Sequence, residues 1–178
     1  MKKIFIRESW VQYAKQNYSG DKYNQNTLLP AGRGQFAGII GECAVGRYFL
    51  DAGIDFDYDA RKSYDYDFIV QGYKIDVKSK FSKGEPQPHY TVRIPEYQKN
   101  QECDLYIFTY VTDSAVFLLG YMHKNEFWET AKYAEKGEQQ ISYIQRVKSN
   151  FIERVDCHYI EVEKLHSIEN LEIKFIEY

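Results

Sequence analysis

The chain has 178 residues, of which 44% are hydrophobic and 28% charged, and its formal net charge is −3 at pH 7. This size suits one domain with a real core, and no apolar run approaches the ~20 residues of a membrane span. The charge balance argues against a protein that coats nucleic acid non-specifically, because such affinity comes from clustered Lys and Arg. Three cysteines without a C-x-x-C pair and four scattered histidines indicate neither a disulfide framework nor a zinc site.

The N-terminal half begins with two predicted helices. The first spans about residues 6–16, with Trp10 and Tyr13 facing inward. Charged residues interrupt this segment before the apolar part of a signal peptide can form, so a cytoplasmic protein is expected. From residue 34 to about 51, apolar residues recur at helical spacing, and Gly53 is the predicted C-cap.

The remainder alternates between predicted strands and short helices. In chain order, these elements are strands at 54–59, 64–70 and 73–80, a strand at TVRI (91–94), a short helix around 96–101, a hairpin of 104–111 with 115–122, a helix from an Asn125 cap to about Glu135 ended by Gly137, and one or two strands within 140–178.

The hairpin of residues 64–70 and 73–80 is the most informative stretch. A two-residue turn at Gln71-Gly72 fixes a register that sets Asp67 opposite Asp76. Like charges directly opposite each other destabilise a sheet. Two explanations fit this pairing: a divalent cation shared by the two carboxylates, or a raised pKa on one of them. Lys78 shares the strand face of Asp76 and is therefore expected beside the pair.

Glu42 is the second unusual acid. It lies in the predicted helix with Gly38 and Gly46 one turn away on either side, and these glycines are expected to let another backbone approach closely. A glutamate in such apolar surroundings needs a partner. That partner is either a metal ion or an arginine, Arg47 or Arg33.

Taken together, a helical Glu42, then Asp67, then the string DVK at 76–78 resembles the motif of the PD-(D/E)xK, or restriction-endonuclease-like, nuclease superfamily. In that family the element order is helix, three strands, helix and strand, which the predicted elements within 34–111 reproduce. The resemblance implies an α/β fold with a restriction-endonuclease-like core (αβββαβ), in which a mixed sheet is flanked by helices.

The resemblance also implies roles for individual residues. Glu42 and Asp67 would bind metal, and Asp76 would bind or bridge metal ions. The carbonyl of Val77 would add a ligand, and Lys78 would act on the attacking water. The implied cofactor is Mg²⁺, for which Mn²⁺ can substitute, and the implied reaction is hydrolysis of DNA phosphodiester bonds by metal-activated water.

One position departs from the family pattern, since Tyr66 stands where the family's name places Pro. Asp65 is a competing candidate for the second metal ligand, because it shares a strand face with Asp67. We favour Asp67 because it opposes Asp76 in the predicted register.

Basic residues gather around these carboxylates: residues 61–83 hold six Lys or Arg against three Asp. Such a local excess suits an enzyme that meets a polyanion at one place, although a solvated strand face explains it equally well. The residues predicted to contact phosphate are Arg61, Lys62, Lys80, Lys83 and Arg93.

We expect a single nuclease-like domain over 1–178, with a core of about 34–122 and a C-terminal extension of about 123–178. The expected partner is DNA, without membrane contact. A homodimer is a reasonable expectation because many duplex-cutting nucleases pair two active sites. Two alternatives stay open: a catalytically inactive nucleic-acid-binding protein with the same fold, and an RNA- or structure-specific nuclease.

Overall fold

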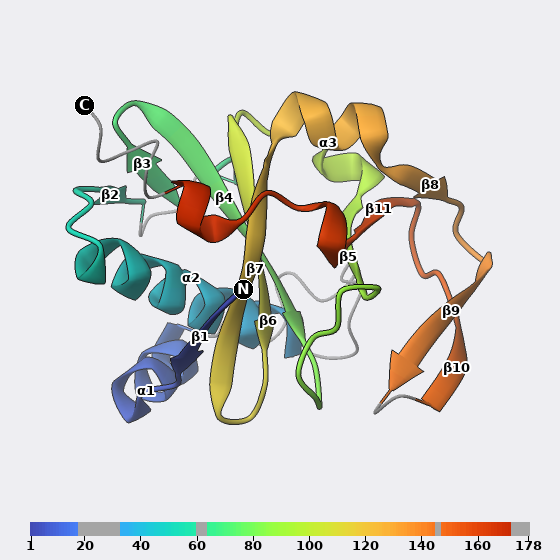
Figure 1. The fold of residues 1–178 in the computed structure, drawn as a ribbon, viewed down its shortest axis with the longest axis horizontal. Helices are drawn as coiled ribbons and strands as arrows, with labels where there is room; N and C mark the ends of the chain where they lie inside the picture. Colours follow the sequence, from blue (N-terminus) through green and yellow to red (C-terminus); the bar gives the residue numbers. More distant parts are fainter. Residues whose placement is uncertain (18–32, 60–63, 145–146, 172–178) are drawn as a thin grey trace.

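The computed structural model describes residues 1–17, 33–59, 64–144 and 147–171. Its centre is a six-stranded sheet in the spatial order β1-β7-β6-β4-β3-β2 (Figure 1). In chain order, these strands are β1 (Lys2–Phe5), β2 (Asp57–Tyr58), β3 (Phe68–Val70), β4 (Tyr73–Phe81), β6 (Leu105–Val111) and β7 (Ala115–His123).

The central sheet is mixed. Strand β4 runs parallel to β6, whereas the other neighbouring strands are antiparallel. The predicted hairpin of 104–111 and 115–122 is confirmed as β6 and β7. Parallel neighbours need a crossover connection, and here it contains β5 (Thr91–Pro95) and a 3-10 turn, η2 (Glu96–Gln98). The helix predicted around 96–101 is therefore a single short turn.

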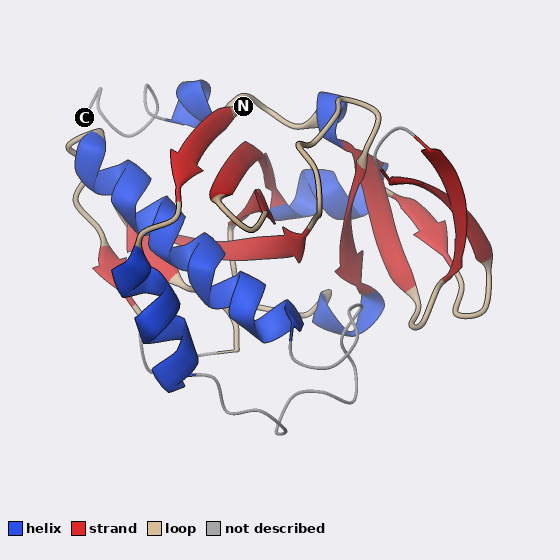
Figure 2. Cartoon of the chain, turned by 90° about the horizontal axis from the view of Figure 1, so that it is seen from below, coloured by secondary structure: helices blue, strands red, loops and turns tan. Residues whose placement is uncertain are grey.

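Helices α1 (Glu8–Asn17) and α2 (Arg33–Asp51) form a layer on one face of this sheet. The long helix α2 packs on β4 and β6, and α1 packs against α2 (Figures 1 and 2). Of the apolar residues of α2 that recur at helical spacing, Ile40 is buried in this layer, as are Ala44 and Phe49, whereas Leu50 is 64% exposed. Burial of this apolar face stabilises the helix far more than its intrinsic propensity does.

The predicted end of α2 is also confirmed. Gly53 has a positive φ of 68°, and the N–H of Ile54 donates to the carbonyl of Phe49 at 2.9 Å. The N–H of Gly53 donates to the carbonyl of Leu50 at 3.2 Å. These two bonds form a Schellman C-cap, which glycine favours because it has no Cβ to clash in the left-handed conformation.

Helix α2 approaches the sheet closely at Gly41, not at the two glycines that the sequence indicated. A Cβ at Gly41 would lie 2.7 Å from Oγ1 of Thr109 and would also overlap Ser79. At Gly46 the nearest neighbour is an ordinary 3.5 Å away on Phe68, and at Gly38 it is 3.9 Å away on Glu42 itself. The prediction for Gly38 and Gly46 was thus wrong, because the face that the helix turns to β4 is fixed by tertiary packing.

The hairpin register is confirmed next to the turn, where Phe68 pairs with Ile75 and Val70 pairs with Tyr73. The predicted pairing of Asp67 with Asp76 was wrong, because the ladder ends at Phe68 and the N–H of Asp67 donates to the carbonyl of Ile75 instead. Gln71 and Gly72 both have positive φ, 49° and 84°, as a type I′ turn requires. Strand β3 is shorter than the predicted 64–70 and shorter than its partner β4. The strand predicted at 54–59 is likewise shorter in the structure, where only Asp57–Tyr58 form β2.

The other face of the sheet is covered by a helix and a second, three-stranded sheet of order β5-β11-β8. A two-stranded hairpin of β9 and β10 extends beyond it (Figures 1 and 2). In chain order, the remaining elements are α3 (Lys124–Thr130), β8 (Lys132–Ala134), β9 (Gln139–Ile144), β10 (Val147–Ile152), β11 (Cys157–Glu161) and the 3-10 turn η3 (Val162–Lys164).

The prediction of a helix from an Asn125 cap to Glu135 was wrong at both ends. His123 occupies the N-cap of α3, and the helix ends at Thr130. Residues 132–134 instead pair with Cys157–Tyr159 of β11. Strand pairing with a distant segment overrides the local helical preference there.

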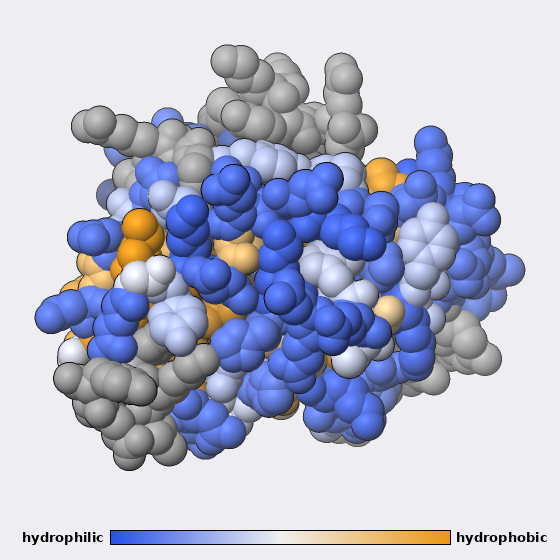
Figure 3. Space-filling view, turned by 90° about the horizontal axis from the view of Figure 1, so that it is seen from above, coloured by the Kyte–Doolittle hydropathy of each residue, from blue (hydrophilic) through white to orange (hydrophobic). Residues whose placement is uncertain are grey.

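The surface seen from above Figure 1 is mostly hydrophilic, with small and separate hydrophobic patches (Figure 3). None of the helices in the described part of the chain is both long and apolar enough to cross a bilayer.

Candidate active site

Asp67 lies just before β3, where the β3–β4 ladder stops. Its N–H donates to the carbonyl of Ile75 at 2.8 Å, and its carboxylate Oδ2 accepts from the N–H of Val77 at 2.7 Å. Ile75 is the residue paired with Phe68, so Asp67 is not itself in regular register. The Asp67 side chain thus takes the place of a backbone acceptor on the free edge of β4.

Asp76 and Lys78 lie next to this edge on one face of β4. The Asp76 side chain is almost fully buried, with the residue 6% exposed, and it forms an ion pair with the Lys78 ammonium. Oδ2 of Asp76 has no hydrogen bond of good geometry among the described residues. The charge contact with Lys78 is therefore its main compensation, and a buried carboxylate oxygen of this kind is costly without a further partner.

Gln101 is the second partner of the Lys78 ammonium. The Nζ of Lys78 donates to Oε1 of Gln101 at 2.8 Å, and the amide of Gln101 donates to the carbonyl of Tyr64. Gln101 is 4% exposed. With an acid and an amide oxygen as its partners, the Lys78 ammonium has a defined position.

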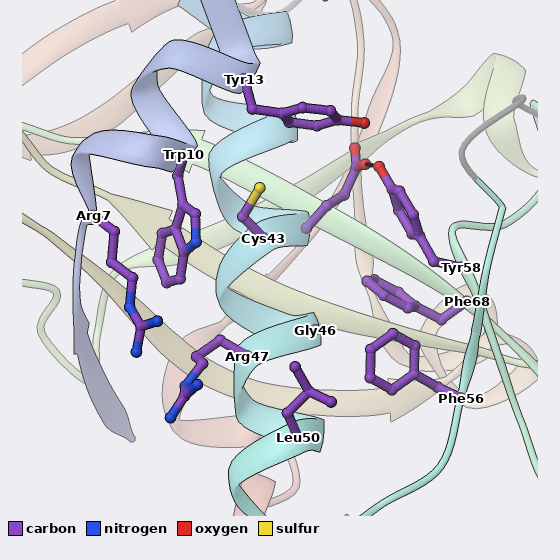
Figure 4. A pocket seen from close by; sticks show the side chains of 11 residues that line it. Arg7, Trp10, Tyr13, Cys43, Gly46, Arg47, Leu50, Phe56, Tyr58 and Phe68 are labelled. Atoms are coloured by element: carbon purple, nitrogen blue, oxygen red, sulfur yellow. Dashed lines mark hydrogen bonds between the residues drawn. The ribbon is translucent and has the colours of Figure 1, made fainter.

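Glu42 reaches the site from α2, on the other face of the sheet. Its Oε2 accepts a hydrogen bond of 2.7 Å from the hydroxyl of Tyr58 on β2, drawn as a dashed line in Figure 4. Burial, and then the charge of Glu42, raise the pKa of Tyr58, so this phenol keeps its proton and acts as a donor. Arg47, one of the arginines considered as a partner of Glu42, instead pairs with Asp51 at 2.9 Å.

The three acids interact through Asp67. Burial raises the pKa of the Asp67 carboxyl well above its usual range, and the negative charges of Glu42 and Asp76 raise it further. The N–H of Val77 and the ammonium of Lys78 act in the opposite direction but do not cancel the rise. Asp67 therefore joins Glu42 on the α2 side of the sheet to Asp76 on the other side.

The competing ligand candidate, Asp65, is engaged elsewhere. Its Oδ1 accepts from the N–H of Glu102 at 3.1 Å. This bond ties the segment before β3 to the segment before β6, which is a structural role.

The residues predicted to contact phosphate differ in burial and in their charged neighbours. Lys80 lies on β4, on the same face as Lys78, with its ammonium 5.3 Å from the centre of the Tyr110 ring. Burial, followed by the positive charge of Arg93, lowers the pKa of Lys80 to about 8. Arg93 is mostly buried and donates to Oε1 of Glu153 at 3.0 Å. Lys83 is exposed in the loop after β4.

Arg61 and Lys62 lie outside the described residues, so the structure says nothing of their contacts with this site. Among the described candidates, Lys80 lies beside Lys78, and the negative charge of Glu153 does not offset the burial and the repulsion by Arg93 that disfavour its ammonium. Lys80 is the best placed of them to meet an anion that approaches Asp76.

Three residues of the site were missed from the sequence: Tyr58, Gln101 and Glu153. The sequence predicts a strand at Tyr58 and the end of a short helix at Gln101, without a functional role for either residue. Tyr58 is 16 residues from its partner Glu42, and Gln101 is 23 residues from its partner Lys78. Glu153 is 60 residues from Arg93. No local sequence pattern predicts contacts over such distances. The only available signal is the general tendency of buried polar groups to form hydrogen bonds.

The donor set is compatible with a hard divalent cation. Carboxylate and carbonyl oxygens are the ligands of Mg²⁺, which is often held by only one or two carboxylates together with water and substrate oxygens. No group of three or more His, Cys, Asp or Glu residues within the described segments is arranged to hold a metal ion by itself. The buried Oδ2 of Asp76 and the mutual repulsion at Asp67 are the two observations that fit a cation here.

The carbonyl of Val77 is consistent with this set. In an extended strand, the N–H and the C=O of one residue point to the same side. The N–H of Val77 points to Asp67, so its carbonyl also faces the side of β4 that carries Asp67.

Comparison of the chain with protein-family models, with curated proteins and with solved structures gives no significant match. The interpretation of the site therefore depends on its own side chains and backbone.

Proposed function

We propose that the protein is a metal-dependent nuclease of the PD-(D/E)xK type that hydrolyses phosphodiester bonds in DNA. The observation that carries the proposal is the position of Asp67, which accepts from the N–H of Val77 beside the Asp76–Lys78 ion pair. Burial raises the pKa of Asp67, and the negative charges of Glu42 and Asp76 raise it further. Buried acids that repel one another are uncommon in a purely structural cluster and are frequent at functional sites.

The order of the elements supports the same proposal. Helix α2 is followed by β2, β3 and β4, then by the 3-10 turn η2 and by β6. This order matches helix, three strands, helix and strand, with two differences: the second helix is one turn long, and β5 precedes it. In this proposal, the site is carried by α2 and β4.

The proposed ligands are the carboxylates of Glu42, Asp67 and Asp76 and the carbonyl of Val77. When bound there, Mg²⁺ or Mn²⁺ polarises a phosphate oxygen and lowers the pKa of a coordinated water. Two of these ligands are positioned by other groups of the chain. The Val77 N–H fixes Asp67, and the Tyr58 hydroxyl fixes Glu42.

Lys78 has the catalytic role in this proposal. Its ammonium, held between Asp76 and Gln101, can orient the attacking water and offset negative charge that develops on the scissile phosphate. Tyr58 and Gln101 act as positioning residues, because they touch Glu42 and Lys78.

Lys80 is the proposed contact to the next phosphate along the strand. Residues two apart on one strand face are roughly 6.5 Å apart, so Lys80 can meet the backbone beside the phosphate at Lys78. We assign weaker contacts to Lys83, Arg61 and Lys62. Arg93 is paired with the buried Glu153 and is not assigned a phosphate contact. We further propose a cytoplasmic homodimer that acts on DNA, since two sites cut two strands.

The test is a cleavage assay with purified protein on supercoiled, linear and single-stranded DNA and on RNA, with Mg²⁺ or Mn²⁺ and with EDTA. We expect cleavage of DNA that needs the metal and that falls at least about 100-fold in Asp76→Asn and in Lys78→Met. Asp65→Asn is the matched control, because asparagine keeps the acceptor for Glu102 and leaves the site untouched.

Other outcomes point to the alternatives. Cleavage of RNA alone would assign the same site to a ribonuclease. Tight DNA binding without cleavage in any metal, together with a neutral Lys78→Met variant, would indicate a binding protein and contradict the proposal.

A further inference from the structure

A pocket of about 320 Å³ opens beside Glu42, between α1, α2 and the β2–β3 edge (Figure 4). It is separate from the Asp76–Lys78 face of β4 and shares only Glu42 and Tyr58 with the site described above. Its volume lies at the lower end of the range of roughly 300–1,000 Å³ for small-molecule sites. The pocket thus suits one flat group, not a duplex.

The lining of the pocket is aromatic and apolar. Trp10 contributes one side, and Phe56 and Phe68 contribute the other, with their ring centroids 5.4 Å apart in a T-shaped arrangement. Leu50 borders the pocket and is 64% exposed, and Tyr58 is 38% exposed. Large apolar side chains left open around a hollow indicate a ligand that covers them.

The two ends of the pocket differ in charge. Arg7 and Arg47 lie toward one end, and Tyr13 and Tyr58 lie toward the other, where Tyr58 meets Glu42 (Figure 4). The guanidinium of Arg7 lies 5.7 Å from the centre of the Trp10 ring. Arg47 is paired with Asp51, so Arg7 is the cation better suited to a new anionic partner.

We propose that this pocket binds one unstacked nucleobase of the DNA strand being cut, stacked against Trp10, with a phosphate next to that nucleotide at Arg7. This inference rests on the proposed nuclease function, because Glu42 belongs to both sites. It adds a substrate class: DNA with an unpaired base next to the scissile bond.

The chemistry of the lining agrees with that assignment. Every base presents a flat π-face, so stacking on Trp10 tolerates any sequence. A base that remains paired cannot enter, which makes the state of the strand, not its sequence, the property recognised.

The first experiment measures binding in EDTA, so that it does not depend on cleavage. Single-stranded oligonucleotides of one length are compared, one intact and a set in which a single abasic nucleotide is moved along the chain. We expect an abasic nucleotide at one position to weaken binding to the unmodified protein by about 5- to 100-fold, and Trp10→Ala to weaken binding of the intact oligonucleotide by a similar factor. With that abasic oligonucleotide, Trp10→Ala should make no further difference.

Matched variants accompany this comparison. Trp10→Phe keeps an aromatic face and should retain most of the affinity for the intact strand. Tyr133→Ala removes an aromatic side chain that is 52% exposed and is outside the pocket, and it should change nothing. Equal effects of Trp10→Ala on the intact and abasic oligonucleotides would overturn the proposal.

A second measurement does not require removal of Trp10. The chain has two tryptophans, so in Trp128→Phe the emission comes from Trp10 alone. Intact oligonucleotide should quench this emission, and the oligonucleotide with the critical abasic position should not. Absence of quenching by saturating intact strand would contradict the proposal even if Trp10→Ala fails to fold.

Failure of this inference and failure of the nuclease function are distinguishable. Metal-dependent cleavage without any effect of the abasic nucleotide would retain the nuclease and reject the base pocket. Base-dependent binding without cleavage would retain the pocket as part of a binding protein and reject the nuclease. Quenching by mononucleotides but not by oligonucleotides would assign the pocket to a free nucleotide and reject a base in a strand.

Discussion

The carboxylate of Asp67 accepts a hydrogen bond of 2.7 Å from the main-chain N–H of Val77. The bond orients one carboxylate oxygen along the edge of β4, where β3 no longer pairs with it. Because the donor belongs to the backbone of a central strand, Asp67 is held in place whether or not an ion is bound. The cost is a carboxylate close to Glu42 and Asp76, both of which raise its pKa.

We therefore expect divalent cations to stabilise the protein. At a Mn²⁺ or Mg²⁺ concentration about ten times Kd, the melting temperature should rise by roughly 3–6 °C. Asp67→Asn should lose this rise, whereas Asp65→Asn, a variant of the acid engaged with Glu102, should keep it. Differential scanning calorimetry with and without EDTA checks this, and an unchanged melting temperature in saturating metal would count against the cation site.

Asp67→Asn should also stabilise the metal-free protein at neutral pH. The pKa of Asp67 in the folded state is raised, so its favourable contribution to folding exists at low pH and is lost as the pH rises through that raised value. Asparagine keeps the acceptor for Val77 without the charge. Urea unfolding of both proteins at pH 5 and pH 8 should show the larger gain at pH 8; a variant less stable than the parent at both pH values would contradict this account.

DNA affinity should fall as the pH rises through about 8, because the pKa of Lys80 is lowered to about 8 by burial and by Arg93. Loss of one charged contact worth ~1 kcal/mol corresponds to roughly fivefold in Kd. Lys80→Arg should make binding independent of pH between 7 and 9, since arginine stays charged. Fluorescence anisotropy at constant ionic strength in EDTA measures this, and a parallel pH profile in the two proteins would exclude Lys80.

The same shift has the opposite consequence for stability. The folded state favours the neutral amine of Lys80, so the contribution of this group to the free energy of unfolding rises as the pH increases from about 8 toward the ordinary lysine value of 10.5. Affinity and stability should thus change in opposite directions over this interval.

Two glycines of α2 should respond oppositely to alanine. Gly41→Ala places a methyl group against Ser79 and Thr109 and should lower the free energy of unfolding by about 1–3 kcal/mol. Gly38→Ala meets nothing closer than 3.9 Å and should raise it by about 0.5–1 kcal/mol, because alanine favours a helix. Urea denaturation followed by circular dichroism compares them, and equal midpoints would show that α2 is not held tightly at Gly41.

The buried ion pair of Arg93 and Glu153 should matter much more than the exposed pair of Lys132 and Glu161. The side chain of Glu153 is 1% exposed, so Arg93→Met leaves a buried charge without its partner and should cost about 3–5 kcal/mol. Lys132, with its side chain 61% exposed, serves as the control, and Lys132→Met should leave the unfolding midpoint unchanged. A double variant, Arg93→Met with Glu153→Leu, should recover part of the loss if the unpaired charge is its cause.

Local patterns in the sequence determined several elements and one register. Helical spacing and Gly53 predict α2 together with its C-cap, and the turn at Gln71-Gly72 predicts which residues of β3 and β4 pair. Such features depend on neighbours within a few positions, where side-chain period and turn chemistry restrict the backbone. The register is what suggested that Asp67 and Asp76 share a site.

Only the tertiary structure decided how that site is held together. The hydrogen bonds of Glu42 with Tyr58 and of Lys78 with Gln101 join segments far apart in the chain, as does the electrostatic influence of Arg93 and Glu153 on Lys80. The strand at 132–134 formed where a helix was expected because β11 offered it backbone partners. In each case, the decisive energy comes from burial and from partners brought together by packing, and a linear pattern contains neither quantity.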